Sequence, residues 1–362
     1  MREFLLDWYE ELATGGFAAL SEPFSNYTPP YLYLLYLMTK TDGIISRVAG
    51  IKLISICFDV LNAFLIYKFL KMKYPQGATA LIGAVAFLLL PTVLLNSAYW
   101  GQADAVYVFF LLACIFFLMK DQPLIAMIFL GMAFSFKAQA SFLGPLILLL
   151  VIRKRIPWIQ LGIIPLVYVL MMIPAALAGF PLMGLLTVYL GQADTYHALS
   201  MHAPNLYLFI PDAVYTPAIF IGISITVIVT LAWTMIYARK IKEFAPENIL
   251  LCALVSAALI PFLLPKMHDR YFYLADVLSF PAAFYFPRGW RLAIGYQLVS
   301  GLVYLIFLVS SMSRMDPLLA GSGYIMATFV NTALLAYVFW FQWSLTDSDS
   351  EKSLYQQEMA RP

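Results

Sequence analysis

Long apolar segments separated by short polar ones follow one another along most of the chain. A helix that crosses a bilayer needs roughly 20 apolar residues, with a range of about 17–25. The apolar stretch 123–152 is too long for one span and has a polar break at Lys137 and Gln139, so we expect two short helices that meet near Lys137. The pattern predicts about 11 spans: 48–70, 78–95, 104–119, two within 123–152, 157–177, 213–237, 247–264, 271–287, 292–311 and 322–343.

The composition is that of a chain embedded in lipid. Of its 362 residues, 62% are hydrophobic and 12% are charged, whereas a soluble domain carries about 25% charged residues. The net charge of +2 is uninformative, and the lack of a basic stripe argues against a nucleic-acid partner. The three cysteines lie inside apolar runs without metal or redox spacing, so we expect no metal site and no cofactor. The predicted fold class is an all-α, polytopic transmembrane bundle.

Lysine and arginine set the expected orientation, because cytoplasmic loops are enriched in them. With eleven spans, the main positive clusters fall on one side, which we assign to the cytoplasm; they lie at 68–73, 120, 153–155, 239–242 and 288–291. The transmembrane domain 1–343 then has a first outer loop, 1–46, and a long outer loop, 178–212. Residues 344–362 form a cytoplasmic tail that we expect to be disordered. The expected location is the inner cell membrane, with the polar motifs on its periplasmic or extracellular face.

The predicted outer position of residues 1–46 is unusual, because neither a span nor a signal peptide precedes them. One interpretation is direct translocation of a short N-terminal segment. The preferred interpretation is that a first transmembrane helix is missing, because the chain is a fragment or its start codon is placed too late.

Two polar motifs of the predicted outer face precede residue 105. In Asn26-Tyr27-Thr28-Pro29-Pro30, the prolines forbid a regular helix and start the next one, which also suits an interfacial re-entry held by aromatic side chains. The second motif groups Trp100, Gln102 and Asp104 between two spans. An N-terminal cap for the next helix would account for Asp104 alone. The three together suit a carbohydrate site, where an indole stacks on the sugar and the polar groups bind its hydroxyls.

Two further motifs carry positive charge on the same face. Lys137 and Gln139 lie within the membrane-spanning part of the sequence. Insertion of a charged side chain at the centre of a transmembrane helix costs about 2.5–3.5 kcal/mol of free energy. A phosphate is the expected partner of Lys137, and an acid on another helix is the alternative. The motif 266–270 combines Lys, His and Arg, which suits an anion such as phosphate or an interfacial salt-bridge cluster. Asn205 belongs to the polar loop 178–212, which we interpret as a lid or acceptor surface.

The order of these motifs resembles the GT-C superfamily of glycosyltransferases, which use polyprenyl-phosphate sugars. It looks closest to bacterial members distantly related to the ER glucosyltransferases that extend lipid-linked oligosaccharides. Those enzymes carry a Tyr-Pro-Pro, a Phe-Lys-Gln and a His-Glu-Lys-type motif in the same order. The matching segments here are Tyr27-Thr28-Pro29-Pro30, Phe136-Lys137-Ala138-Gln139 and His268-Asp269-Arg270, within about residues 1–285. The resemblance implies inverting transfer of a hexose, mannose or glucose, to a hydroxyl of a lipid-linked glycan, polysaccharide or protein on the non-cytoplasmic side.

The resemblance also implies roles for single residues. Lys137, His268 and Arg270 would face the donor phosphate, in place of a metal. The general base would be an acid in the first outer loop; aligned on Trp8 it falls at or before Met1, which leaves Glu3 and Asp7, with Asp104 as a further catalytic candidate. A chain extended upstream by one helix is therefore expected to be more active. The expected substrate-binding residues are Asn26, Tyr27, Trp100, Gln102, Gln139, Asn205 and Asp269.

Two other functions fit parts of the pattern. A transporter or flippase could use the charged residues inside the apolar segments, namely Lys52, Asp59 and Lys137. Transporters commonly contain inverted repeats, and no internal repeat is found here. A non-catalytic scaffold with a sugar-lipid pocket is the third possibility.

Overall fold

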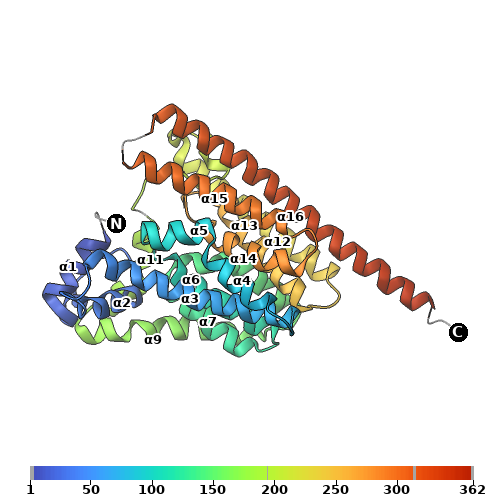
Figure 1. The fold of residues 1–362 in the computed structure, drawn as a ribbon, viewed down its shortest axis with the longest axis horizontal. Helices are drawn as coiled ribbons and strands as arrows, with labels where there is room; N and C mark the ends of the chain where they lie inside the picture. Colours follow the sequence, from blue (N-terminus) through green and yellow to red (C-terminus); the bar gives the residue numbers. More distant parts are fainter. Residues whose placement is uncertain (1–3, 194, 313–314, 360–362) are drawn as a thin grey trace. The chain divides into compact units, whose positions relative to one another are not determined.

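The computed structural model describes residues 4–193, 195–312 and 315–359. Its backbone is 78% helical, which confirms the all-α prediction. The described strands are two-residue segments, β1 (Ser200–Met201) and β2 (Met267–His268). The chain divides into two compact units, unit 1 (Met1–Ser141 and Pro157–His197) and unit 2 (Phe142–Ile156 and Ala198–Pro362). Figure 1 shows the helices of both units, coloured along the sequence.

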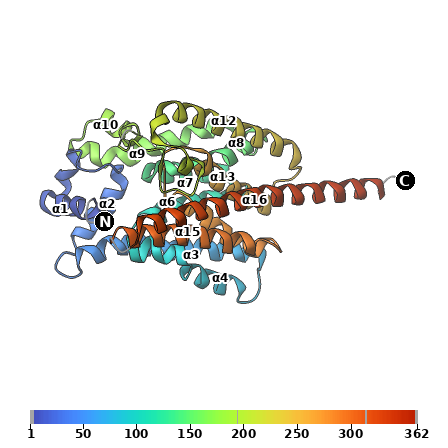
Figure 2. The same ribbon diagram turned by 90° about the horizontal axis from the view of Figure 1, so that it is seen from above.

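Unit 1 is built around a helical hairpin, in which α6 packs on α7 and α3 covers α6. On the far sides, α4 packs on α3 and α9 packs on α7, and Figure 2 shows α3 and α4 side by side. A Cβ atom on Gly131 of α7 would lie 2.7 Å from the Cβ of Val167 in α9, so this helix contact requires glycine. The helices of unit 1 are α1 (Leu5–Gly15), α2 (Pro29–Thr39), α3 (Arg47–Lys73), α4 (Thr79–Leu88), α5 (Pro91–Val93), α6 (Asp104–Met119), α7 (Pro123–Phe136), α9 (Ile163–Ala178), α10 (Leu182–Leu186) and α11 (Val188–Ala193).

Unit 2 surrounds one central helix, α13, whose residues 249–263 are all buried. The helices α8, α12, α14 and α16 pack on α13, and α15 packs on α14 and α16. A Cβ atom at Gly289 would lie 2.1 Å from the carbonyl oxygen of Ala282, so the tight turn between α14 and α15 requires glycine. The helices of unit 2 are α8 (Gly144–Ile152), α12 (Tyr215–Lys240), α13 (Pro246–Leu263), α14 (Tyr273–Tyr285), α15 (Trp290–Ser310) and α16 (Pro317–Met359).

The long apolar helices make the chain an integral membrane protein. Among the described residues, six helices have the length and hydropathy of a span: Arg47–Lys73, Trp158–Ala178, Asp212–Lys240, Pro246–Leu263, Trp290–Ser310 and Pro317–Thr346. The pair Thr79–Leu88 and Pro91–Trp100, bent by 42°, would add a seventh. The other apolar helices are shorter; α6, with 16 residues, is about 24 Å long against a hydrocarbon core of about 30 Å. The count of eleven spans therefore stays a prediction.

The break predicted within 123–152 is present. The helix α7 ends at Phe136, Lys137 is extended with φ −151° and ψ 137°, and a 3-10 helix, Ala138–Leu143, leads into α8. The segment 344–362, expected to be disordered, instead continues α16 as a helix through Met359. Figure 1 shows the end of α16 extending beyond the other helices of unit 2.

A tyrosine hydroxyl joins α2 to α9 within unit 1. The Tyr33 hydroxyl donates to the carbonyl oxygen of Met171 at 3.1 Å and accepts from the backbone N–H of Ala175 at 3.1 Å. Those two backbone groups lie four residues apart and would bond to each other in an uninterrupted helix. Pro174 lies inside the same turn of α9. The inserted hydroxyl therefore satisfies both groups and fixes α2 against α9.

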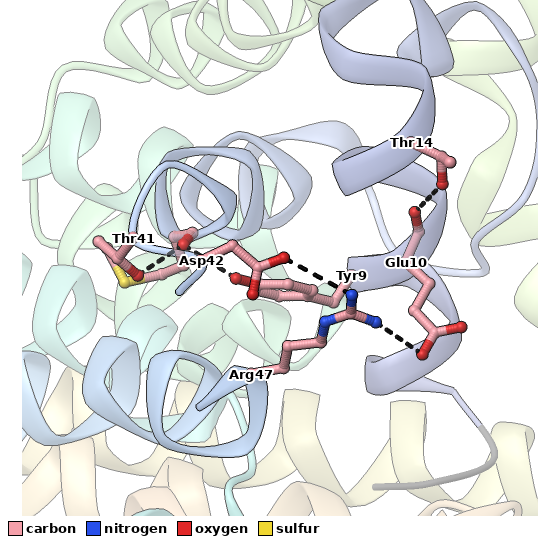
Figure 3. Close-up of polar contacts among 7 residues, drawn as sticks. Tyr9, Glu10, Thr14, Thr41, Asp42 and Arg47 are labelled. Carbon is pink, nitrogen blue, oxygen red and sulfur yellow. Dashed lines mark hydrogen bonds and ion pairs between the residues drawn. The ribbon is translucent and has the colours of Figure 1, made fainter. Parts of the chain in front are cut away.

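The first helix is attached to the turn between α2 and α3 by polar contacts (Figure 3). The Tyr9 hydroxyl donates to the carbonyl oxygen of Met38 at 3.0 Å. Arg47, at the start of α3, pairs with Glu10 at 3.0 Å and with Asp42 at 3.6 Å. These ion pairs are exposed, and such pairs contribute about 0–1 kcal/mol. The position of α1 therefore depends mainly on its buried apolar face, which includes Trp8.

Cysteine labelling would test the predicted orientation. In a variant without the native cysteines, we expect Lys40→Cys to react with a membrane-impermeant maleimide in intact bacterial cells, because it lies in the predicted outer loop. Lys154→Cys lies in a predicted cytoplasmic cluster and should react only after permeabilisation. Both side chains are exposed, so differences in burial do not explain the contrast. Labelling of both positions in intact cells would contradict the orientation, and the cysteine-free protein is the background control.

Candidate functional site

A buried ion pair joins the second and third sequence motifs in unit 1. Lys137 Nζ lies 2.7 Å from Asp104 Oδ1, and the two side chains are 7% and 1% exposed. The pair follows from the hairpin, because α6 and α7 have similar lengths, 16 and 14 residues, and a short turn joins them. The first residue of α6 and the residue after α7 thus meet at the same end. Lys137 was expected to face a phosphate, and the structure gives it the alternative partner, an acid on another helix.

Asp104 has a second partner, Asn96, whose Nδ2 donates to Oδ2 at 3.0 Å. Asn96 belongs to a π-helix, Leu94–Trp100, which ends at Gly101 with a left-handed φ of 76°. Segments of π-helix are rare and occur often at functional sites. The alternative interpretation, that Asp104 caps α6, does not hold, because the cap position is Ala103 and no side chain of the described residues bonds there. As the first residue of α6, the Asp104 carboxylate still benefits from the positive end of the helix dipole.

Aromatic rings surround the ammonium group of Lys137. Its Nζ lies 5.1 Å from the ring centroid of Tyr27 and 5.9 Å from that of Tyr107. The ring of Tyr27 in turn packs on two other rings. Its centroid lies 5.0 Å from that of Trp8 and 5.4 Å from that of Tyr31. Such cation–π contacts contribute about 0.5–2 kcal/mol each, the larger values applying where water is excluded. The first motif therefore reaches the same ion pair as the second and third.

The end of α7 is held by side chains from two segments that are distant in the sequence, the first outer loop and α11. The last carbonyl groups of a helix have no partner within it. Thr28 Oγ1 donates to the carbonyl oxygen of Phe136 at 3.2 Å, and the Tyr189 hydroxyl donates to that of Phe134. Gln192 Nε2 donates to the backbone oxygen of Asn26, which ties the first motif to α11. Tyr189 was missed by the sequence reasoning, because nothing in its surroundings distinguishes it from an interfacial tyrosine.

Buried polar atoms without a partner gather beside the ion pair. Asn96 Oδ1, Ser97 Oγ and the Tyr31 hydroxyl are buried, and none of them makes a hydrogen bond to another of the described residues. Burial raises the pKa of the Tyr31 phenol, and the neighbouring Tyr27 and Asp104 raise it further. Leaving a buried polar group unpaired costs about 1–3 kcal/mol, so these atoms are available to hydrogen-bond a polar ligand. Tyr31 was not singled out as a site residue, although it stands next to the Pro-Pro sequence.

The remaining predicted residues of unit 1 contribute less. Trp100 is buried at the end of the π-helix, and Gln102 and Gln139 are half-buried. Within the described part of the chain, the amide groups of these two glutamines make no hydrogen bond. Asp7 is exposed on α1 and has no ion pair among the described residues. Glu3 lies outside the described residues.

The fourth motif lies in unit 2, where β1 and β2 pair in parallel and join the long outer loop to the turn 264–270. Backbone bonds flank the strands, from Lys266 N to Leu199 O at 2.7 Å and from Asp269 N to Met201 O at 3.0 Å. Arg270 Nη1 lies 3.6 Å from Asp269 Oδ1. The ring centroid of His268 lies 5.1 Å from that of Tyr271. The motif thus includes a salt bridge, as the alternative interpretation of an interfacial salt-bridge cluster requires, and Lys266, His268 and Arg270 belong to one structured turn.

Asn205 has a structural position in unit 2. Its side chain is fully buried, and Nδ2 donates to the carbonyl oxygens of Pro261 and Leu264 at 3.0 and 3.2 Å. Its Oδ1 accepts from the backbone N–H of Tyr207 at 3.1 Å. All three partners are backbone groups, so Asn205 anchors the outer loop to the end of α13. The substrate-binding role expected for Asn205 stays a prediction, and the bonds of its side chain give it a structural role.

The ion pair can be tested by a double-mutant cycle. Removing one partner of a buried pair leaves an uncompensated charge, so we expect Asp104→Asn and Lys137→Met each to destabilise the protein by about 3–5 kcal/mol. The double variant removes both charges and should be more stable than the sum of the single changes predicts. The free energy of unfolding of each variant is measured by chemical denaturation in detergent, with tryptophan fluorescence as the signal. Arg47→Ala, in the exposed pairs, is the control and should cost less than about 1 kcal/mol. Additive single effects would contradict the direct pair.

The anchor role of Asn205 gives a second test. Asn205→Ala leaves buried carbonyl oxygens without donors, at a cost of about 1–3 kcal/mol. We expect faster proteolysis within 195–212 and a lower melting temperature. Asn248→Ala is the matched control, because its Nδ2 makes one exposed bond, to the carbonyl oxygen of Glu243 at 2.9 Å. Equal effects of the two substitutions would contradict a special role for Asn205.

Comparison of the sequence with protein-family models finds no match, and comparison with curated proteins finds none either. The residues and their geometry are therefore the basis for assigning a function.

Proposed function

We propose that the chain is a membrane glycosyltransferase, which moves a hexose from a polyprenyl-phosphate sugar to an acceptor hydroxyl. The observation that carries the proposal is the convergence in unit 1. Three motifs that lie far apart in the sequence, around Tyr27, Asp104 and Lys137, meet at one buried ion pair. A structural salt bridge needs only the two charged groups. The π-helix, the aromatic rings and the unpaired polar atoms beside it are features of a ligand site.

Glycosyl transfer requires a group that accepts the proton of the attacking hydroxyl and groups that stabilise the departing phosphate. In the proposed mechanism, the Asp104 carboxylate accepts the hydroxyl proton as the new bond to the anomeric carbon forms. Lys137 holds Asp104 in position in the free enzyme and offers its positive charge to the donor. The bond between the anomeric carbon and the phosphate oxygen breaks, and its electron pair leaves with polyprenyl phosphate. Direct displacement inverts the anomeric carbon.

The sugar itself would be bound by the groups that have spare hydrogen-bonding capacity. Asn96 Oδ1 and the Tyr31 hydroxyl are suited to sugar hydroxyl groups. The ring of Tyr27 and the indole of Trp8 supply apolar faces of the kind on which sugar rings stack. The resemblance also implies contact with the donor phosphate for His268 and Arg270, which belong to unit 2. We expect both to be needed for transfer.

A transfer assay with purified full-length protein tests the proposal. Radiolabelled polyprenyl-phosphate-mannose and polyprenyl-phosphate-glucose are supplied in nanodiscs with a crude lipid-acceptor extract. We expect labelled product with one donor, and a loss of at least about 100-fold in Asp104→Asn, as general acid–base groups contribute about 10²–10⁴-fold. Lys137→Met, His268→Ala and Arg270→Ala should also lose transfer. Donor hydrolysis and photo-crosslinking of the donor lipid are measured in parallel.

Matched controls separate the site from general damage to the fold. Asp59→Asn removes another buried carboxylate of unit 1, and Lys52→Met removes a lysine of the same helix, α3. Both should retain activity within a few-fold. Asp104→Glu keeps the charge but displaces the carboxylate, so it should fold and still transfer poorly. A folded wild-type protein that neither binds, hydrolyses nor transfers either donor would overturn the proposal.

A further inference from the structure

A second candidate site lies in unit 2, in an apolar groove between α12 and α16. Its volume is about 400 Å³, within the range of about 300–1,000 Å³ that small-molecule sites occupy. Its walls include Trp233, Ile236 and Tyr237 of α12, and Trp340 and Trp343 of α16. Ile236, Trp340 and Trp343 are each about half exposed, whereas Trp233 and Tyr237 are buried. The groove is therefore open on one side and closed by aromatic side chains on the other.

The polar groups beneath the groove are already bonded within the protein. Trp233 Nε1 donates to Gln342 Oε1 at 3.0 Å, and Gln342 Nε2 donates to Cys252 Sγ at 3.2 Å. Gln342 and Cys252 are buried. Because these groups are occupied, the wall offers a ligand only aromatic and aliphatic surface. A hydrocarbon chain fits this chemistry, and a sugar or a peptide does not.

One end of the groove is positively charged. The groove is lined by one face of α12, which includes Trp233, Ile236 and Tyr237. Lys240 is the next residue on the same face of the helix. Lys240 Nζ lies 2.9 Å from the ring centroid of Trp343, so its charge lies at the groove wall. Lys240 belongs to the cluster 239–242, which the charge pattern assigns to the cytoplasmic side.

The helix end would repel an anion if its carbonyl groups were left bare, because a helix C-terminus carries about half a negative charge. Arg153 reduces this repulsion, because its guanidinium binds one carbonyl group of the last turn and one just beyond the helix. Its Nη1 donates to the carbonyl oxygen of Ala238 at 2.7 Å, and its Nη2 donates to that of Lys242 at 3.0 Å. The last turn of α12 therefore presents net positive charge beside a channel for hydrocarbon.

We propose that this groove binds an anionic glycerophospholipid of the cytoplasmic leaflet, with one acyl chain between α12 and α16 and its phosphate at Lys240. An acyl chain gains the same apolar contacts whatever its head group, so the preference for an anionic lipid comes from Lys240. A basic residue near the membrane surface contributes about 1 kcal/mol to anionic lipid binding, which corresponds to about a fivefold change in affinity. This proposal is independent of the glycosyltransferase proposal.

Binding can be measured with lipids whose acyl chains carry bromine, which quenches tryptophan at contact. The full-length protein is reconstituted in phosphatidylcholine and titrated with brominated phosphatidylglycerol or brominated phosphatidylcholine. Polyprenyl phosphate, which carries no bromine, is tested by its ability to displace the brominated lipid and so restore the fluorescence. We expect saturable quenching that favours phosphatidylglycerol and is reduced in Trp340→Phe. Native mass spectrometry should show one phosphatidylglycerol retained per chain. No sugar donor is present, so failure of this test is separate from failure of the transfer assay.

Two pairs of variants locate the lipid. Lys240→Gln should weaken phosphatidylglycerol binding about fivefold, whereas Arg239→Gln, which removes the same charge from an adjacent exposed position, should not. Ala232→Trp fills the groove and should abolish retention, whereas Leu231→Trp, on a neighbouring lipid-facing position, should leave it unchanged. Equal binding of phosphatidylglycerol and phosphatidylcholine, or equal effects within either pair, would overturn the proposal. Preferential binding of polyprenyl phosphate would overturn it in favour of a donor-lipid groove.

Discussion

The buried pair of Asp104 and Lys137 is the interaction on which the organisation of unit 1 depends. Neither charge could be buried alone in apolar surroundings, so the start of α6 and the end of α7 must stay together. A pair of this kind contributes little net stability, because the cost of removing both charges from water offsets their attraction. Its contribution is structural: the pair holds the start of α6 against the end of α7. The segments around that end of the hairpin therefore pack against a rigid part of the protein.

The surrounding contacts follow from that fixed point. The helix α7 stops at Phe136 so that Lys137 can turn toward Asp104, and its exposed carbonyl groups then require donors, which Thr28 and Tyr189 supply. The π-helix before Gly101 brings Asn96 to the second carboxylate oxygen. Thr28, Asn96 and Tyr189 belong to three segments that lie far apart in the sequence. One electrostatic requirement thus explains why the first loop, the π-helix and α11 converge.

Sequence reasoning predicted the features that depend on local pattern. The helices and the break at Lys137 followed from apolar periodicity interrupted by a charge. The partner of Lys137 did not, because Asp104 lies 33 residues away and only the similar lengths of α6 and α7 bring it near. The structural bonds of Asn205 were not predicted, because Pro261 and Leu264 lie 56 and 59 residues away in the sequence. Helix α16 continues past residue 343, where polar composition suggested disorder.

The Tyr33 hydroxyl inserted into α9 has a consequence for how this protein can change over evolution. It binds backbone groups of Met171 and Ala175, and backbone groups are the same whatever side chains occupy those positions. Residue 171 can therefore vary without breaking the junction, whereas residue 33 must keep a phenolic hydroxyl. Among homologous sequences, an invariant tyrosine opposite a variable stretch of helix would be the record of this contact.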